Sequence, residues 1–131
     1  MTLRQCKEER EQKLSDLFKN CRLFWAFSNE QFAKNKTPLE EGEKHVSIGS
    51  GGYLPNTQAK RFSDGLDEIG KWFNDAIRDN GLRREYIIYE LANHEAWYTW
   101  DIQDTLTALG PDYTQEEVWA IFCEERENQL V

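Results

Sequence analysis

Apolar residues recur at helical spacing along much of the chain. The clearest stripe predicts a helix over 57–79, where apolar side chains repeat every three or four positions: Phe62, Leu66, Ile69, Trp72, Phe73 and Ile77. Gly81 follows at the expected C-cap position. A second stripe predicts a helix over 3–20, with Leu14, Leu17, Phe18 and Cys21 on one face.

Capping signals predict further helices in the last third of the chain. A helix is expected from Leu82 to about Leu91. Asp101 can cap a short helix that runs to Leu109, before Gly110-Pro111. The sequence Thr114-Gln115-Glu116-Glu117 is a capping box, and the final helix after it is expected to bury Val118, Ile121 and Phe122.

Shorter patterns between the first two long helices predict a small sheet. The bulky run 23–27 and the alternating run 45–48 are typical of strands, and a third short strand follows Gly49-Ser50-Gly51-Gly52. Ser28 or Asn29 can cap a short helix over 30–34, and the polar stretch 34–43 is expected to be a loop. We therefore predict a mostly helical α+β fold, with about five to six helices packed on a two- or three-stranded antiparallel sheet. It is expected to form a single domain over 1–131, with its core in 22–122 and a helix over 1–20 that can be peripheral.

Composition supports a folded chain in a reducing compartment. The 131 residues are 39% hydrophobic and include five Trp, five Tyr and seven Phe. The N-terminus lacks the apolar core of a signal peptide, and no apolar run reaches the roughly 20 residues of a membrane helix. Cys6, Cys21 and Cys123 have no paired spacing, which disfavours a disulfide framework or a zinc site. These features predict a cytoplasmic location.

Negative charge is concentrated near the C-terminus. Residues 1–84 hold 13 acids and 15 bases, whereas 85–131 hold 11 acids and one base, Arg126. A bare acidic surface repels nucleic acid directly, but it attracts a basic groove on another protein. The alternative is that the charge only aids solubility.

Candidate catalytic motifs are weak. The glycine loop 49–52 has neither dinucleotide-binding nor P-loop spacing, so a structural turn is favoured. His94, Glu95, Asp101 and Asp104 form the densest group of potential metal ligands, but their spacing is poor, and structural roles as caps or backbone partners are favoured. A thiol–imidazole pair of Cys21 with His94 is a further alternative to a buried structural Cys. No catalytic residue or cofactor is assigned.

Trp97 and Trp100 are the most informative aromatic residues. They flank Tyr98 and Thr99 beside carboxylates in an irregular segment, and aromatic rings are enriched at interface hot spots. The competing interpretation is that the rings seal the core of a small domain. Stacking on nucleic-acid bases is disfavoured by the local negative charge.

Four segments together resemble a group of small proteins encoded on conjugative elements, plasmids and phages of gut Firmicutes. They are Phe24-Trp25-Ala26-Phe27-Ser28-Asn29-Glu30-Gln31-Phe32, Ser47-Ile48-Gly49-Ser50-Gly51-Gly52-Tyr53, Tyr89-Glu90-Leu91-Ala92-Asn93-His94-Glu95-Ala96 and Asp101-Ile102-Gln103-Asp104-Thr105-Leu106-Thr107-Ala108-Leu109-Gly110. The resemblance spans about residues 22–122, although that group usually has Tyr or a smaller residue at the positions of Trp97 and Trp100. It implies a mobile-element setting, in which small acidic proteins often antagonise host defence, as anti-CRISPR proteins do.

The sequence thus favours a non-enzymatic inhibitor whose acidic C-terminal face docks on a basic nucleic-acid-binding protein, such as a CRISPR effector. The expected partner-binding residues are Trp97, Trp100, Asp101, Asp104, Asp112, Glu116, Glu117, Glu124, Glu125 and Glu127. Two alternatives are a metal-dependent enzyme or metal-binding protein centred on His94, Glu95, Asp101 and Asp104, and an accessory scaffold without nucleic-acid mimicry.

Overall fold

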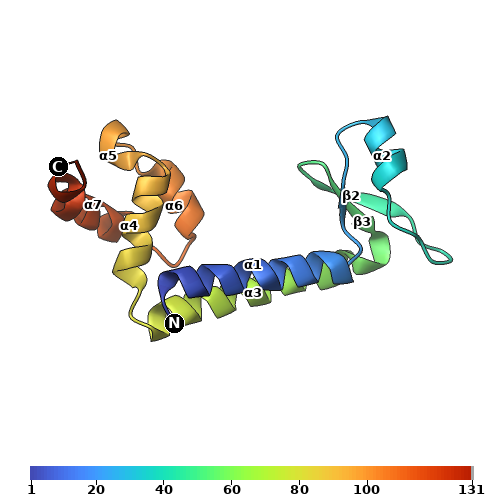
Figure 1. Ribbon diagram of the computed structural model, residues 1–131, viewed down its shortest axis with the longest axis horizontal. Helices are drawn as coiled ribbons and strands as arrows, with labels where there is room; N and C mark the ends of the chain where they lie inside the picture. Colours follow the sequence, from blue (N-terminus) through green and yellow to red (C-terminus); the bar gives the residue numbers. More distant parts are fainter. Residues whose placement is uncertain (131) are drawn as a thin grey trace. The chain divides into compact units, whose positions relative to one another are not determined.

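The computed structural model describes residues 1–130 and shows a mostly helical α+β fold with a three-stranded antiparallel sheet (Figure 1). Seven α-helices occur in this part of the chain, one more than the upper end of the predicted range. The additional helix is α5, a single turn at Ala96–Thr99. The chain divides into two compact units, which we call the N-terminal unit (Arg4–Asp75) and the C-terminal unit (Met1–Leu3 with the chain from Ala76 on). The prediction that they behave as one domain stays a prediction.

Two long helices dominate the N-terminal unit, α1 (Leu3–Asn20) and α3 (Ala59–Asp79). They lie side by side and run antiparallel (Figure 1). The end of α1 contacts the start of α3, and the middle of α1 contacts a later part of α3. The Phe18 and Phe62 rings are 5.9 Å apart, whereas Arg10 lies over the ring of Phe73 at 3.9 Å. The α3 stripe predicted from the sequence therefore packs on α1.

Gly65 allows the two helices to approach closely. A Cβ atom at this position would lie 2.5 Å from Leu17 Cδ1, which is too close for real carbon atoms. A Cβ atom added at Gly70 would have no other atom within 4 Å. The two glycines of α3 thus differ, because a Cβ at position 65 would displace the end of the flexible Leu17 side chain and a Cβ at position 70 would displace nothing.

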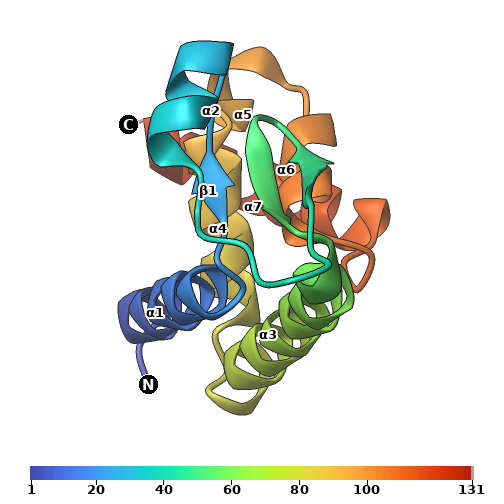
Figure 2. The ribbon, with the colours of Figure 1, turned by 90° about the vertical axis from the view of Figure 1, so that its right-hand side faces the viewer.

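The chain between these helices forms the sheet, in the order β1-β3-β2 (Figure 2). The strands are β1 (Phe24–Trp25), β2 (His45–Gly49) and β3 (Gly52–Pro55). The first strand is shorter than the predicted run 23–27, because its pairing with β3 stops after Trp25↔Gly52. The short helix α2 (Asn29–Asn35) follows β1, and the 3₁₀ turn Asn56–Gln58 follows β3.

The predicted caps and turns of this region are present. Ser28 Oγ accepts the backbone N–H of Gln31 at 3.1 Å and so caps α2. Ser50 and Gly51 both have positive φ, 51° and 81°, as the tight turn of a hairpin requires. The glycine loop 49–52 is therefore the turn between β2 and β3, and the phosphate-binding alternative gains no support.

The C-terminal unit packs α4 (Arg83–Asn93) against α5, α6 (Gln103–Leu109) and α7 (Gln115–Leu130). Its core includes Ile77 from the end of α3, Ile87 and Leu91 from α4, Ala96 from α5, Thr105 from α6, and Val118 and Phe122 from α7. The prediction that the last helix buries Val118, Ile121 and Phe122 is confirmed.

Local hydrogen bonds fix the starts and ends of these helices. Gly81 (φ 64°) ends α3, where the N–H of Leu82 bonds the carbonyl of Ile77 at 2.9 Å. Asp101 Oδ1 accepts the backbone N–H of Gln103 at 2.9 Å, at the start of α6. Thr114 Oγ1 accepts the backbone N–H of Glu117 at 3.2 Å, which is one half of the predicted capping box.

No helix among residues 1–130 has the length and apolarity needed to cross a membrane.

Candidate functional site

Aromatic rings gather around Phe122 in the C-terminal unit. Trp97 and Trp119 stack against the Phe122 ring, with centroids 5.5 Å and 4.9 Å away, and Trp100 meets its edge at 5.6 Å. Such contacts add to the stabilisation from apolar burial alone. We call these four residues the aromatic cluster.

The cluster corrects the expected role of Trp97. Its side chain is only 4% exposed, so the ring seals the core and has almost no surface to offer a partner. Trp100 is 52% exposed and Trp119 is 40% exposed. The sequence interpretation of Trp97 and Trp100 as a matched pair of anchors is therefore wrong for Trp97.

The backbone around Trp97 adopts conformations that non-glycine residues rarely adopt. Glu95 (φ 57°) and Trp100 (φ 62°) both lie in the left-handed region, immediately before and after the single turn α5. A left-handed backbone conformation costs an ordinary residue roughly 1–2 kcal/mol of free energy. We infer that packing of Trp97 on Phe122 offsets this cost, and the sequence shows no turn signal there that would have predicted α5.

Trp100 carries a cation on one ring face. The guanidinium carbon of Arg126 lies 4.0 Å from the ring centroid. Arg126 is the one base in the acidic stretch 85–131, and this contact places it on an aromatic ring. The exposed part of Trp100 is therefore next to a positive charge.

Glu117 is paired rather than bare. Arg83 donates from Nε and Nη2 to the two carboxylate oxygens of Glu117, both at 2.7 Å. These bonds, together with the backbone N–H of Thr114, hold the pKa of Glu117 below its usual value, although partial burial opposes the shift. Glu117 completes the capping box and is balanced by Arg83, so it is not a free charge for a partner.

Glu124 and Glu125 share a second arginine. Arg84 donates from Nη1 to Glu124 at 2.8 Å and from Nη2 to Glu125 at 2.7 Å. The hydrogen bond from Arg84 is the main reason that the pKa of Glu125 is lowered. Three of the eight expected acids are thus ion-paired with Arg83 or Arg84, so their charge is partly balanced within the chain.

The other expected acids are exposed. They are Asp101, Asp104, Asp112, Glu116 and Glu127. Asp101 also uses one oxygen to cap α6. The C-terminal unit as a whole holds twelve acids and four bases, whereas residues 4–75 hold twelve of each. The net charge of −8 therefore belongs to the C-terminal unit.

One face of α7 combines exposed acids with exposed apolar atoms. Spacings of three and four put Glu116, Trp119, Ala120, Cys123 and Glu127 on one side of the helix, and all five are exposed. We call these residues the α7 stripe. Thr114, Gln115, Glu116 and Trp119 line a shallow hollow at its N-terminal end.

The sequence analysis missed Trp119 as a surface residue. The acids of the final helix were predicted to bind a partner, but the apolar residues beside them were not. The same spacing rule applied to 116, 119, 120 and 123 places Trp119 and Ala120 on one outer face with Glu116. Tyr98, which lies within α5 and is 76% exposed, was also left out of the expected site.

The four residues of the metal-centred alternative do not form a cluster. No group of three or more His, Cys, Asp or Glu side chains within residues 1–130 is arranged to hold a metal ion. His94 Nε2 instead lies 3.2 Å from Glu90 Oε2, one turn earlier on α4. His94 therefore faces the buried Glu90 of its own helix, although the two atoms do not have hydrogen-bond geometry.

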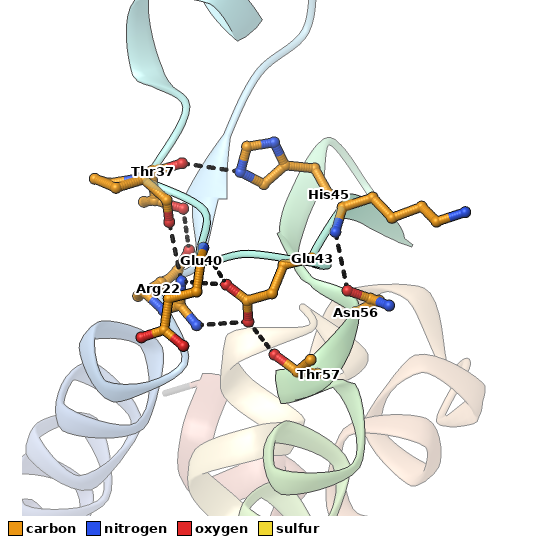
Figure 3. A network of polar contacts seen from close by, with 9 residues as sticks. Arg22, Thr37, Glu40, Glu43, His45, Asn56 and Thr57 are labelled. Carbon is orange, nitrogen blue, oxygen red and sulfur yellow. Dashed lines mark hydrogen bonds and ion pairs between the residues drawn. The ribbon is translucent and has the colours of Figure 1, made fainter.

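A second polar network lies in the N-terminal unit (Figure 3). The Glu43 side chain is 4% exposed and accepts two bonds from the Arg22 guanidinium, at 2.9 Å and 2.8 Å. It also accepts from the Thr57 hydroxyl and from the backbone N–H of Glu40. These donors lower the pKa of Glu43 to about 2, with Arg22 as the largest cause.

This network joins three segments of the N-terminal unit. Arg22 follows α1, Glu43 lies in the loop before β2, and Thr57 lies just before α3. Arg22 itself has φ 56°, a conformation that favours glycine. We infer that its side chain is needed here as the partner of Glu43. A carboxylate with this many donors is a weak base, so the network holds the fold rather than performs chemistry.

The thiol of Cys21 is equally unsuited to catalysis. It is fully buried, and burial raises its pKa, so the unreactive protonated form prevails at neutral pH. Cys21 thus behaves as a small core residue, and the thiol–imidazole alternative with His94 gains no support.

A protein-family model described as a family of unknown function, DUF7659, matches residues 6–122. No curated protein and no solved structure matches the chain.

Proposed function

The chain belongs to the DUF7659 family of unknown function, and we propose that it is a non-enzymatic interaction protein whose C-terminal unit docks on a basic nucleic-acid-binding protein. The observation that carries this proposal is the α7 stripe. It has the two properties of a protein interface, a central apolar surface and a charged rim.

Charge favours a basic partner. The C-terminal unit carries all of the net charge of −8, and Glu116 and Glu127 stand at the two ends of the stripe. A groove built to hold a phosphate backbone presents Lys and Arg, which such a surface attracts and orients. The proposed contact set is therefore Trp100, Trp119, Glu116 and Glu127, with Asp101, Asp104 and Asp112 as peripheral charges.

The mobile-element setting suggested by the sequence resemblance makes a host-defence protein the favoured partner. We propose a CRISPR effector in a reducing cytoplasm, where the acidic surface occupies the channel for guide or target. Inhibition then needs no catalytic residue, since occupancy alone excludes the nucleic acid.

Binding to a purified, guide-loaded CRISPR effector of the host tests this proposal. Electrostatic docking predicts that affinity falls steeply as salt rises from about 50 mM to about 500 mM. It also predicts competition by target DNA. Binding that is indifferent to both would contradict the mechanism.

A matched pair of charge reversals tests the location of the surface. The double variant Glu116→Lys and Glu127→Lys is expected to abolish binding. Glu11→Lys with Asp67→Lys makes the same change in net charge on exposed positions of the N-terminal unit, and should weaken binding far less. Equal losses would mean that only net charge matters and that the stripe is not the docking surface.

The accessory-scaffold alternative makes the opposite prediction. If the acids are merely solvated, the reversal at 116 and 127 leaves every partner interaction intact. A pull-down from host lysate, eluted with salt and repeated with that variant, separates the two cases.

A further inference from the structure

The apolar face shared by α1 and α3 is incompletely covered in the middle of both helices. None of its large residues there is fully buried: Leu14, Leu17, Phe18, Phe62, Leu66, Ile69 and Trp72. Leu66 is 38% exposed although it lies in the strongest apolar stripe of the sequence. A periodic stripe normally faces a core.

The ends of the helix pair are different. Phe73 is 3% exposed near the end of α3, and Cys21 and Phe24 are buried just beyond α1. The central turns of α1 and α3 thus form a single layer of two helices, with no second layer packed on it. A stable helical layer buries its apolar stripe against another layer. The sequence of this region therefore specifies more packing than a single N-terminal unit supplies.

Charged side chains of both signs border this region. Lys13, Asp16, Asn20 and Glu68 line one shallow groove between the helices, together with the apolar Leu17, Ile69 and Trp72. A second groove is bordered by Lys60, Arg61, Asp64 and Glu68. Residues 4–75 as a whole are electrically neutral.

We infer that this face is a self-association surface, which packs against the same face of a second copy to give an antiparallel four-helix arrangement. Two-fold pairing brings a patch against itself, so the patch must carry both signs of charge for cations to meet anions. The α1–α3 borders satisfy this condition with Lys13, Arg61, Asp16 and Glu68, whereas Lys60 and Asp64 already pair with each other at 2.8 Å. A strongly basic protein would be repelled by Lys13, Lys60 and Arg61. An anionic membrane surface would be repelled by Asp16, Asp64 and Glu68.

Helix geometry is suited to this pairing. The helices have 18 and 21 residues and run antiparallel, as do neighbours in a four-helix bundle. Four such helices bury the central stripe of each copy between two layers. The inference concerns residues other than the α7 stripe and does not depend on the proposed function.

Sedimentation equilibrium of the full chain, over a wide range of concentration, tests this inference. The expected species has twice the mass of the 15.5 kDa chain. Residues 4–75 are electrically neutral, so association driven by burial of their apolar surface should persist as salt rises. Binding to the basic partner should weaken under the same change, which distinguishes failure of one proposal from failure of the other.

Leu66→Lys places a charge in the middle of the proposed interface and is expected to give a monomer. Asp67→Asn makes the same change in net charge at the next exposed position, and should remain dimeric. Circular dichroism verifies that both variants keep their helices. A wild-type chain that is monomeric at every concentration, or a folded Leu66→Lys that stays dimeric, overturns the inference.

Discussion

The two compact units of this chain reach stability in different ways. The C-terminal unit packs three Trp rings around Phe122 and leaves its Arg83–Glu117 ion pair partly exposed. The N-terminal unit packs the rings of Phe32 and Tyr53 on Phe24 and buries the carboxylate of Glu43. Each unit holds two non-glycine residues at positive φ. The C-terminal unit carries a net charge of −8 and the N-terminal unit carries none. The difference shows that one short chain can place its whole excess of charge in one of two compact units, each of which has its own buried core.

Removal of the Phe122 ring is the largest expected perturbation. Phe122→Ala takes away the common partner of three Trp rings and should cost about 3–5 kcal/mol of unfolding free energy. Urea denaturation followed by two-dimensional NMR checks which unit is affected. If only the folded-state NMR signals of the C-terminal unit disappear at lower urea, the two units fold independently. If the signals of both units disappear together, the predicted single domain is supported.

The corresponding test in the N-terminal unit uses its two helical glycines. Gly65→Ala forces Leu17 or the helix pair to move and should cost about 1–3 kcal/mol. Gly70→Ala meets nothing within 4 Å and should instead stabilise by up to about 1 kcal/mol. Thermal melts of both variants measure the difference. Equal effects would mean that close packing at Gly65 is not important.

Acid should weaken the polar network of the N-terminal unit. Glu43 has a pKa of about 2 in the folded chain, compared with 4.5 for a free group. Its contribution to stability is therefore complete above about pH 4.5 and is lost as pH falls toward about 2. Melting temperatures of the wild type and Glu43→Gln, measured across this range, should converge at low pH. A constant gap between the two curves would contradict the role of Glu43.

The smallest expected effect is on the charge of the C-terminal unit. Arg84→Ala releases Glu124 and Glu125 from an exposed ion pair, which should change stability little. It should tighten binding to a basic partner, because two more bare carboxylates face solvent. The salt titration of binding proposed above, repeated with this variant, measures the gain. Weaker binding would show that the pairing itself shapes the docking surface.

Local sequence signals predicted most of the secondary structure. The stripe over 57–79 follows from residues three or four positions apart. The caps at Ser28, Asp101 and Thr114 and the turn at Gly81 depend on hydrogen bonds between residues only a few positions apart. The predictions failed at α5, where two non-glycine residues adopt left-handed conformations. Nothing local favours that geometry, since it depends on the packing of Trp97 against Phe122, 25 positions later in the printed sequence.

The candidate site was predicted only in part for a similar reason. The sequence by itself determined the helices, the hairpin and the excess of acids, because these follow from composition and from interactions between near neighbours. Only the tertiary structure decided which acids remain bare and which rings remain exposed. Arg83 reaches Glu117 across 34 positions and Arg22 reaches Glu43 across 21. Such pairs exist only after packing has brought distant segments together, so no local pattern contains them.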